Sequence, residues 1–123
     1  MEQFLELLSQ SLEGLPSDSG RYAVAFSGGV DSTVLLAALM RLVPRPEVRA
    51  LHIDHGLHPD SRAWVGHCRA IANTLGTDCV SRQVHIKNKA GESLEALARE
   101  ARYQALGELL TPGEILLTAH HSD

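Results

Sequence analysis

The part of this sequence with the most chemistry is a run of six residues, Ser27, Gly28, Gly29, Val30, Asp31 and Ser32. Two adjacent glycines let the backbone turn tightly and approach an anion closely. Backbone amides at the start of a helix, together with the helix dipole, favour negative charge at the same place. The hydroxyls of Ser27 and Ser32 add donors, whereas the carboxylate of Asp31 would repel a bare phosphate. A divalent cation between carboxylate and phosphate removes that repulsion, so the run predicts a site for magnesium-bound pyrophosphate.

The same residues are also typical of a plain turn in which Asp31 or Ser32 caps a helix. Their position favours the phosphate site, because they lie between an apolar strand and an apolar helix. Open α/β sheets bind ligands beyond the carboxyl ends of their strands, where such a loop lies. The run has no Gly-Lys-Ser/Thr ending typical of a Walker loop, and it has no G-x-G-x-x-G pattern of a dinucleotide fold.

Strands that alternate with helices must position this loop. Apolar runs predict strands at 21–26, 48–54, 78–86 and 114–119, of which 78–86 has the weakest alternation. Helical spacing predicts an N-terminal amphipathic helix around 4–15 and further helices at 31–42, from 60 or 61 to 75, and at 94–109. This order predicts an α/β fold with right-handed crossovers: a Rossmann-like parallel sheet with helices on both faces.

Length and composition limit the class of protein. The 123 residues are 44% hydrophobic and 21% charged, which is typical of one globular domain or a piece of a larger one. No apolar run approaches the roughly 20 residues of a membrane-spanning helix, and the acidic N-terminal segment does not resemble a secretory signal. We therefore expect a cytoplasmic protein that does not enter membranes. The net charge of −4 argues against a stand-alone nucleic-acid-binding domain.

Four motifs carry a resemblance to a known family. AVAF followed by SGGVDS resembles the pyrophosphate loop of the N-type ATP pyrophosphatases, which cleave ATP between its α- and β-phosphates. LHIDHGLHPDS, GESLEALAREARYQAL and LLTAHHSD follow in order, and together they resemble the tRNA(Ile)-lysidine synthetase family over nearly the whole sequence. The resemblance implies an adenine nucleotide alpha-hydrolase-like fold. It also implies that residues 1–123 are the N-terminal part of a PP-loop ATP-binding catalytic domain, without its C-terminal part and the tRNA-binding domains.

The same resemblance implies a reaction. Members of that family adenylate the wobble cytidine of tRNA(Ile) with a CAU anticodon, and the amino group of L-lysine then displaces AMP to form lysidine at C2. The implied substrates and cofactors are ATP, Mg²⁺, L-lysine and tRNA(Ile), the tRNA being held mainly by regions missing here. Two alternatives remain open: another PP-loop enzyme with a different acceptor, or a non-catalytic module that binds adenine nucleotides.

The resemblance also implies roles for individual residues. Residues 27–32 would bind ATP, with Asp31 positioning magnesium, and His52 and Ile53 would contact the adenine. On the helix at 94–109, Arg102 would stabilise charge on the phosphates as the adenylate forms. The remaining candidates are Arg99 and Tyr103 near the nucleotide or the cytidine, His120 at the nucleotide, and Asp123 at the metal.

From residue types alone, two of these groups have a simpler interpretation. A set of imidazoles and carboxylates could hold a transition metal, but it lacks typical zinc spacing and is more typical of a polar loop: His52, Asp54, His55, His58 and Asp60. The stripe that contains Arg99 and Arg102 is typical of a solvated helix face with a Glu95–Arg99 pair.

Cys68 and Cys79 form no Cys-x-x-Cys pair, which argues against a sulfur-inserting relative. Cys68 falls on the apolar stripe of its predicted helix, and Cys79 falls near a strand start. Both are therefore predicted to be thiols of the core rather than nucleophiles.

Overall fold

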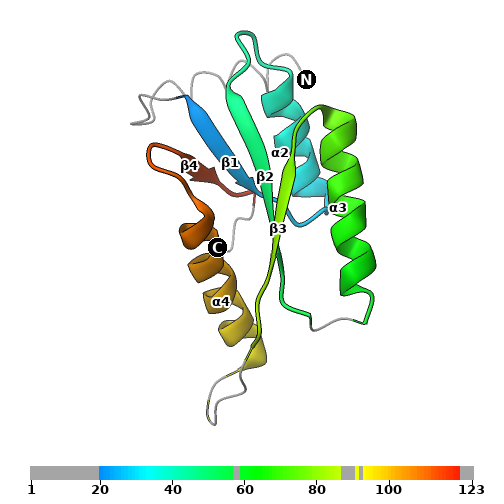
Figure 1. The fold of residues 1–123 in the computed structure, drawn as a ribbon, viewed down its shortest axis with the longest axis vertical. Helices are drawn as coiled ribbons and strands as arrows, with labels where there is room; N and C mark the ends of the chain where they lie inside the picture. Colours follow the sequence, from blue (N-terminus) through cyan, green and yellow to red (C-terminus); the bar gives the residue numbers. More distant parts are fainter. Residues whose placement is uncertain (1–19, 57–58, 87–90, 92, 120–123) are drawn as a thin grey trace.

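The fold is a parallel sheet with helices on both faces (Figure 1). The computed structural model describes residues 20–56, 59–86, 91 and 93–119. The elements in this part of the chain are β1 (Arg21–Ala25), α2 (Val30–Met40), β2 (Glu47–Asp54), α3 (Ser61–Leu75), β3 (Cys79–Gln83), α4 (Leu94–Leu109) and β4 (Ile115–Leu117). The predicted α/β class and the alternation of strands and helices are confirmed. The N-terminal helix predicted around 4–15 lies outside the described residues.

The strand order β3-β2-β1-β4 places the first strand inside the sheet. Parallel pairing joins β1 to β2 from Arg21 opposite Glu47 onward, and it joins β1 to β4 from Tyr22 opposite Ile115 onward. The chain therefore builds outward through β2 and β3 and then crosses to the other side of β1. Such a reversal of direction is where open α/β sheets bind ligands, and the 27–32 loop leaves β1 at that point.

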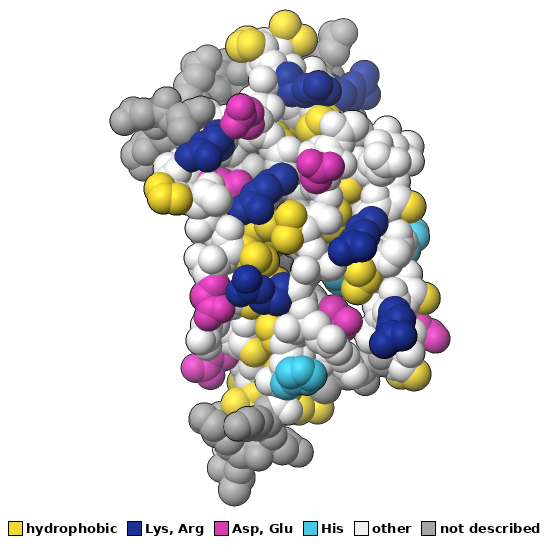
Figure 2. Space-filling model, in the orientation of Figure 1, with side chains coloured by type: hydrophobic (Ala, Val, Ile, Leu, Met, Phe, Trp, Pro, Cys, Tyr) yellow, Lys and Arg dark blue, Asp and Glu magenta, His cyan; other side chains and the backbone are white. Residues whose placement is uncertain are grey.

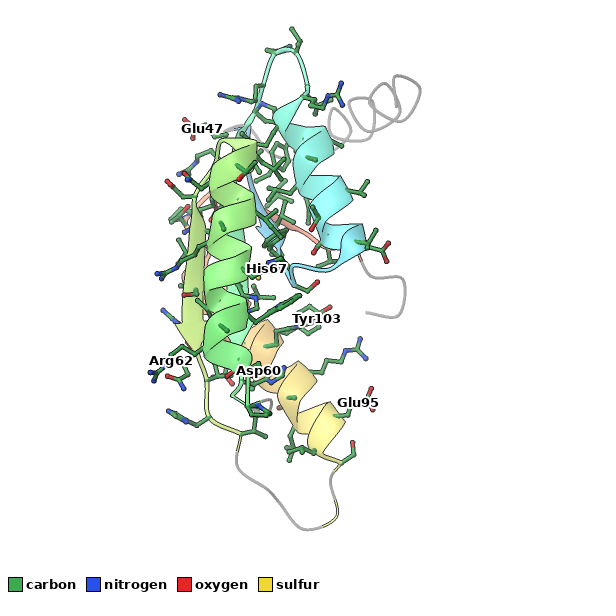
Figure 3. The ribbon with its side chains drawn as sticks, turned by 90° about the vertical axis from the view of Figure 1, so that its right-hand side faces the viewer. Glu47, Asp60, Arg62, His67, Glu95 and Tyr103 are labelled. Atoms are coloured by element: carbon green, nitrogen blue, oxygen red, sulfur yellow. The ribbon has the colours of Figure 1, made fainter. Side chains whose placement is uncertain are left out.

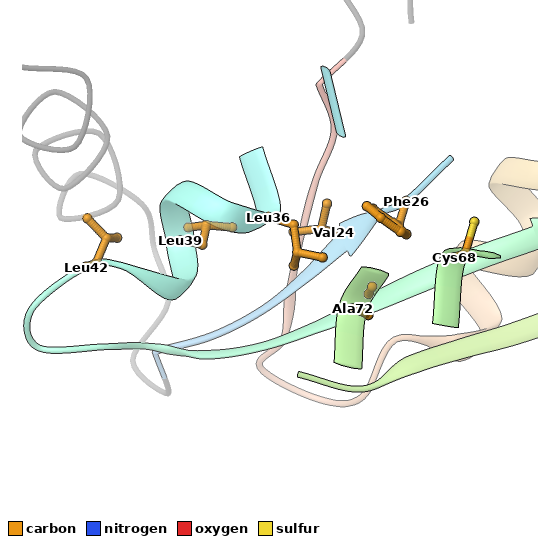
Figure 4. Packing of buried hydrophobic residues seen from close by; sticks show 8 residues of the cluster. Val24, Phe26, Leu36, Leu39, Leu42, Cys68 and Ala72 are labelled. Atoms are coloured by element: carbon orange, nitrogen blue, oxygen red, sulfur yellow. The ribbon is translucent and has the colours of Figure 1, made fainter. Parts of the chain in front are cut away.

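Alternation along the strands produces two cores. On one face, α2 and α3 pack against β1 and β2, and this core contains eight buried residues, seven of them labelled in Figure 4: Val24, Phe26, Leu36, Leu39, Leu42, Ala50, Cys68 and Ala72. On the other face, α4 packs Ala105 and Leu106 against four strand residues: Ala23, Ala25, Leu51 and Ile53. β1 is thus buried on both faces, as its continuous apolar sequence predicts.

Helix ends follow their sequence signals in part. Gly76 ends α3 in the left-handed region at φ +92°, and the side chain of Ser93 accepts a hydrogen bond from the amide of Ala96 at 3.1 Å. Asp60 takes the N-cap position of α3, but its side chain makes no capping hydrogen bond there. The predicted start of α3 is confirmed, but the predicted capping hydrogen bond is not.

No helix in the described part of the chain is long and apolar enough to cross a bilayer.

An ion pair ties β2 to the segment that leads into β4. The guanidinium of Arg49 donates to both carboxylate oxygens of Glu114 at 2.7 Å, and it also donates to the carbonyl of Leu109 at 2.7 Å. The side chain of Glu114 is only 5% exposed. Hydrogen bonding to Arg49 lowers the pKa of Glu114 below its ordinary value of 4.5. The pair therefore holds together segments that are distant in sequence.

We expect Arg49→Met to lower the free energy of unfolding at pH 7 by about 2 kcal/mol, because it leaves a buried carboxylate without its partner. Arg82→Met is the matched control, since Arg82 pairs with Glu108 at 3.1 Å in an exposed position. Because the pKa of Glu114 is lowered by folding, its contribution is present above the unfolded pKa and is lost as the pH falls through the folded value. Urea unfolding of both variants measures the loss in free energy of unfolding. Equal losses in Arg49→Met and Arg82→Met would contradict the stabilising role that we assign to the pair of Arg49 and Glu114.

Candidate functional site

The 27–32 loop joins the carboxyl end of β1 to α2 and is closed by its own serines. The amide of Ser27 donates to Oγ of Ser32 at 3.2 Å, and the two hydroxyl oxygens lie 3.1 Å apart. The amide of Gly29 donates to Oγ of Ser27 at 3.2 Å. Ser32 is fully buried. These hydroxyls therefore hold the loop in shape, and a direct contact between them and a ligand stays a prediction.

Gly28 is the position in this loop where only glycine fits. Its φ is +80°, and a Cβ built on it would lie 2.8 Å from Sγ of Cys68 and 3.2 Å from two ring atoms of Trp64. An L-residue would be strained in this conformation and would also collide with α3. The loop backbone thus lies directly against that helix.

The start of α2 is open. Gly29 takes the N-cap position with φ −80° and ψ 177°, and no side chain caps the helix. The interpretation in which Asp31 or Ser32 serves as the cap is therefore wrong. Oγ of Thr33 instead donates to the carbonyl of Gly29 at 2.7 Å. Asp31 is exposed in the first turn. Uncapped amides beside an exposed carboxylate are the groups that a magnesium-bound phosphate requires.

A cavity of about 540 Å³ opens beside the loop. It lies at the carboxyl ends of β1 and β2, between the start of α3 and the middle of α4; Asp60 and Tyr103 mark these two helices in Figure 3. The lining residues are Ala25, Phe26, Ser27, Leu51, His52, Ile53, Asp54, His55, Asp60, Ser61, Trp64, Arg102 and Leu106. Four predicted site residues thus come together here: Ser27, His52, Ile53 and Arg102.

Arg102 and Arg99 separate in the structure. Arg102 lines the 540 Å³ cavity, and its guanidinium lies 5.0 Å from the centroid of the Tyr103 ring. Arg99 is exposed, and its guanidinium lies 5.8 Å from the same centroid. It lines a second cavity of about 450 Å³ together with Glu95 and Tyr103. The two arginines, each predicted to lie near the nucleotide or the cytidine, therefore line different cavities.

His52 holds the end of β1. It is 7% exposed, and its Nδ1 lies 2.9 Å from the carbonyl oxygen of Phe26. Because a carbonyl only accepts, Nδ1 is the donor in this contact. Sγ of Cys68 lies 3.6 Å from the same nitrogen. The imidazole therefore shapes the cavity wall, and its contact with adenine stays a prediction.

The cysteines are core thiols, as predicted. Cys68 is fully buried, and burial raises its pKa to about 12. Cys79 is half-buried, and burial also raises the pKa of its thiol. Both side chains are free. Neutral thiols at physiological pH are poor nucleophiles, so neither residue is placed to attack a substrate.

Trp64 was missed as a site residue. Helical spacing places it on the apolar stripe of α3, but it is 44% exposed, and its Nε1 donates to the carbonyl of Ser27 at 2.6 Å. His55 is interpreted from sequence only as part of a polar loop, but it lines the cavity, and its Nδ1 is buried without a hydrogen-bond partner among the described residues. The sequence signal that could have indicated these residues is their position after a strand that neighbours β1, because segments that follow neighbouring parallel strands meet at the carboxyl ends of the sheet.

Some predicted residues cannot be placed. His58, His120 and Asp123 lie outside the described residues. Within the part of the chain that is described, no group of three or more His, Cys, Asp or Glu side chains is arranged to hold a metal ion.

Comparison with known proteins gives a consistent result. The whole chain, residues 1–123, matches the PP-loop domain family. It is 51% identical over 120 residues to a tRNA(Ile)-lysidine synthase of Alkalilimnicola ehrlichii, covering 96% of this chain and 27% of that protein. The synthase of Hydrogenovibrio crunogenus is 41% identical over 119 residues, covering 97% and 28%, respectively. That of Methylococcus capsulatus is 46% identical over 104 residues, covering 83% and 24%. The chain spans about a quarter of the length of these curated relatives.

Proposed function

Because this chain belongs to the PP-loop domain family, we propose that it binds ATP and forms the N-terminal part of the catalytic domain of a tRNA(Ile)-lysidine synthase. Membership of the family implies ATP binding. The 41–51% identity to three such synthases supports the choice of acceptor. The single observation that carries the ATP site is geometric: Ser27 lines a cavity of about 540 Å³, and the loop that begins there leads into an uncapped helix start with an exposed Asp31.

In the proposed complex the phosphates lie at the 27–32 loop and the nucleoside lies in the cavity. Its volume falls within the range of small-molecule sites, and its walls are partly apolar, with Ile53 and Leu106 among them. Polar side chains that could face a base or a ribose, among them His55 and Arg102, line the same cavity. This arrangement leaves the α-phosphate between the loop and α4, where a cytidine would have to arrive.

The reaction then proceeds in two displacements. The C2 oxygen of the cytidine attacks the α-phosphorus of ATP, and the bond to the β-phosphate oxygen breaks, which releases pyrophosphate. The lysine amino group next forms a C–N bond at C2, and AMP leaves with the oxygen. The loop amides hold the negative charge of the departing pyrophosphate, and Arg102 stabilises charge on the α-phosphate.

Magnesium fits the residues that are present. Sites for this ion commonly combine one or two carboxylates with substrate phosphates and water rather than an all-protein cage. Asp31 offers one exposed carboxylate beside the uncapped helix start. We propose that Asp31 holds the ion, with Asp123 as a second ligand, and that the ion neutralises phosphate charge.

We propose that other parts of the protein make most of the contacts with the tRNA. On the face in Figure 2, basic side chains are spread out, with acidic side chains among them. The net charge of −4 also disfavours a large phosphate-binding surface on this chain. A tRNA substrate places the enzyme in the cytoplasm.

We expect the intact protein to release AMP from ATP only when L-lysine and unmodified tRNA(Ile) are both present. Thin-layer chromatography of labelled ATP measures this, and tRNA that already carries lysidine is the control. AMP release with tRNA but with another acceptor in place of lysine would favour a different PP-loop enzyme. Tight binding of ATP without any AMP release would favour a nucleotide-binding module and would contradict the proposed reaction.

A further inference from the structure

We propose that Trp64 is a positioning residue of the phosphate-binding loop: its indole N–H holds the carbonyl of Ser27 and thereby aims the amide of Gly28 at the phosphates. This inference rests on the proposed function, because it assigns a role within the same ATP site. Trp64 lies in the first turn of α3, which belongs to a different strand–helix unit from the loop.

Two contacts join this side chain to the loop. Nε1 of Trp64 donates to the carbonyl oxygen of Ser27 at 2.6 Å. Two atoms of the indole ring lie 3.2 Å from the point that a Cβ of Gly28 would occupy. The hydrogen bond thus fixes one peptide group, and the flat ring supports the residue that follows it.

Peptide geometry converts the first contact into an orientation. The carbonyl of Ser27 and the amide of Gly28 belong to one trans peptide plane and point in opposite directions. A carbonyl held toward α3 therefore turns the Gly28 amide away from α3. No described residue accepts a hydrogen bond from that amide. An amide that is held in place and left without an acceptor is a donor available to an anion.

The preceding peptide group follows the same rule. His52 holds the carbonyl of Phe26 at 2.9 Å, and the amide of Ser27, in the same plane, donates to Ser32 at 3.2 Å. Two consecutive carbonyls are thus fixed by ring N–H groups from outside the loop. In the peptide plane of Phe26 and Ser27, Ser32 accepts the hydrogen bond of the amide. In the second plane, that of Ser27 and Gly28, no described residue accepts a hydrogen bond from the amide. The second plane is therefore the one built for a ligand.

If Trp64 served only to fill the core, its side chain would be buried like those of its neighbours on α3. The indole is 44% exposed, while the core residues beside it on α3, Cys68 and Ala72, are fully buried. Phenylalanine keeps an aromatic ring at position 64, but it lacks Nε1 and Cζ2 and so removes the N–H donor together with the indole edge that lies against Gly28. We therefore expect Trp64→Phe to fold, and we expect its effect to appear in anion binding.

The test measures binding of magnesium pyrophosphate and of adenosine, separately, to the intact protein by isothermal titration calorimetry. Trp64→Phe should weaken pyrophosphate about tenfold, which is the loss expected from one well-placed hydrogen bond, and should leave adenosine within about twofold. His67→Ala is the matched control, because the centroid of the His67 ring lies 4.4 Å from that of Trp64 and His67 forms no hydrogen bond with the described residues of the loop. It should bind both ligands like the wild type.

Each other outcome is decisive. Unchanged pyrophosphate binding in Trp64→Phe would overturn the inference while ATP binding by the wild type still stood. Equal weakening of both ligands would also overturn it, since Trp64 would then be only a wall of the cavity. Wild-type protein that binds neither ligand would overturn the proposed function, and this inference with it. Trp64→Tyr is a second variant, because its hydroxyl lies at a different position from the indole N–H, and it should behave like Trp64→Phe.

Discussion

Replacing Asp31 by Asn is expected to lower AMP formation from ATP at least about 100-fold while the fold stays intact. The substitution removes one negative charge and keeps the size of the side chain. Asp31 is exposed in the first turn of α2, so its loss costs the fold only the helix-dipole contribution, about 0.3–1 kcal/mol. The large effect falls on turnover, because the amide is a much weaker ligand for magnesium than the carboxylate. Labelled-ATP assays and thermal unfolding measure the two quantities.

Glu47→Gln is the matched control for charge removal. Glu47 is exposed at the amino end of β2, the opposite edge of the sheet from the loop, and it is labelled in Figure 3. This variant should keep full activity. An Asp31→Asn protein with wild-type turnover at limiting magnesium would refute the role that we propose for this carboxylate.

Replacing Gly28 by Ala is expected to abolish binding of ATP and to lower the free energy of unfolding by about 2 kcal/mol. The φ of +80° is costly for alanine, and the new methyl would lie 2.8 Å from Sγ of Cys68, a buried atom that has little room to move. The loop must then leave α3, which would break the hydrogen bond between Trp64 and Ser27. Calorimetric titration with ATP and urea unfolding measure the two effects.

Gly66→Ala provides the comparison on α3 itself. A Cβ at Gly66 would meet nothing within 4 Å, and alanine favours helix, so this variant should gain up to about 1 kcal/mol and bind ATP normally. A Gly28→Ala protein that binds ATP as tightly as Gly66→Ala would show that the loop conformation described here is not needed for the nucleotide.

Local patterns predict the loop and its neighbours well. The apolar run before Ser27 predicts a strand at 21–26, and the apolar run that stops before Pro44 predicts a helix at 31–42. The observed β1 and α2 begin and end within two residues of these predictions. Gly76 ends its helix, as predicted, because glycine readily adopts the left-handed backbone conformation. Such features depend on a few adjacent residues, so one sequence is enough to find them. The weakly alternating stretch 78–86 yields a shorter strand, Cys79–Gln83, at the edge of the described sheet.

Contacts between distant segments are not predictable in this way. Helical spacing groups Trp64 with Cys68, but it does not say that the indole turns out of the core toward Ser27. The i, i+3 spacing of Arg99 and Arg102 likewise does not reveal that only Arg102 lines the 540 Å³ cavity. These outcomes depend on how α3 and α4 are rotated against the sheet. The packing of the whole fold sets that rotation.

We propose above all that the 27–32 loop holds the phosphates of ATP while the adjacent cavity holds its nucleoside. A crystal structure of the intact protein with magnesium and a non-hydrolysable ATP analogue tests it most directly. We predict phosphate density within hydrogen-bond distance of the Gly28 amide and the α2 amides, with the adenosine between His52 and Arg102. A triphosphate bound elsewhere, with this loop and cavity empty, would contradict the account.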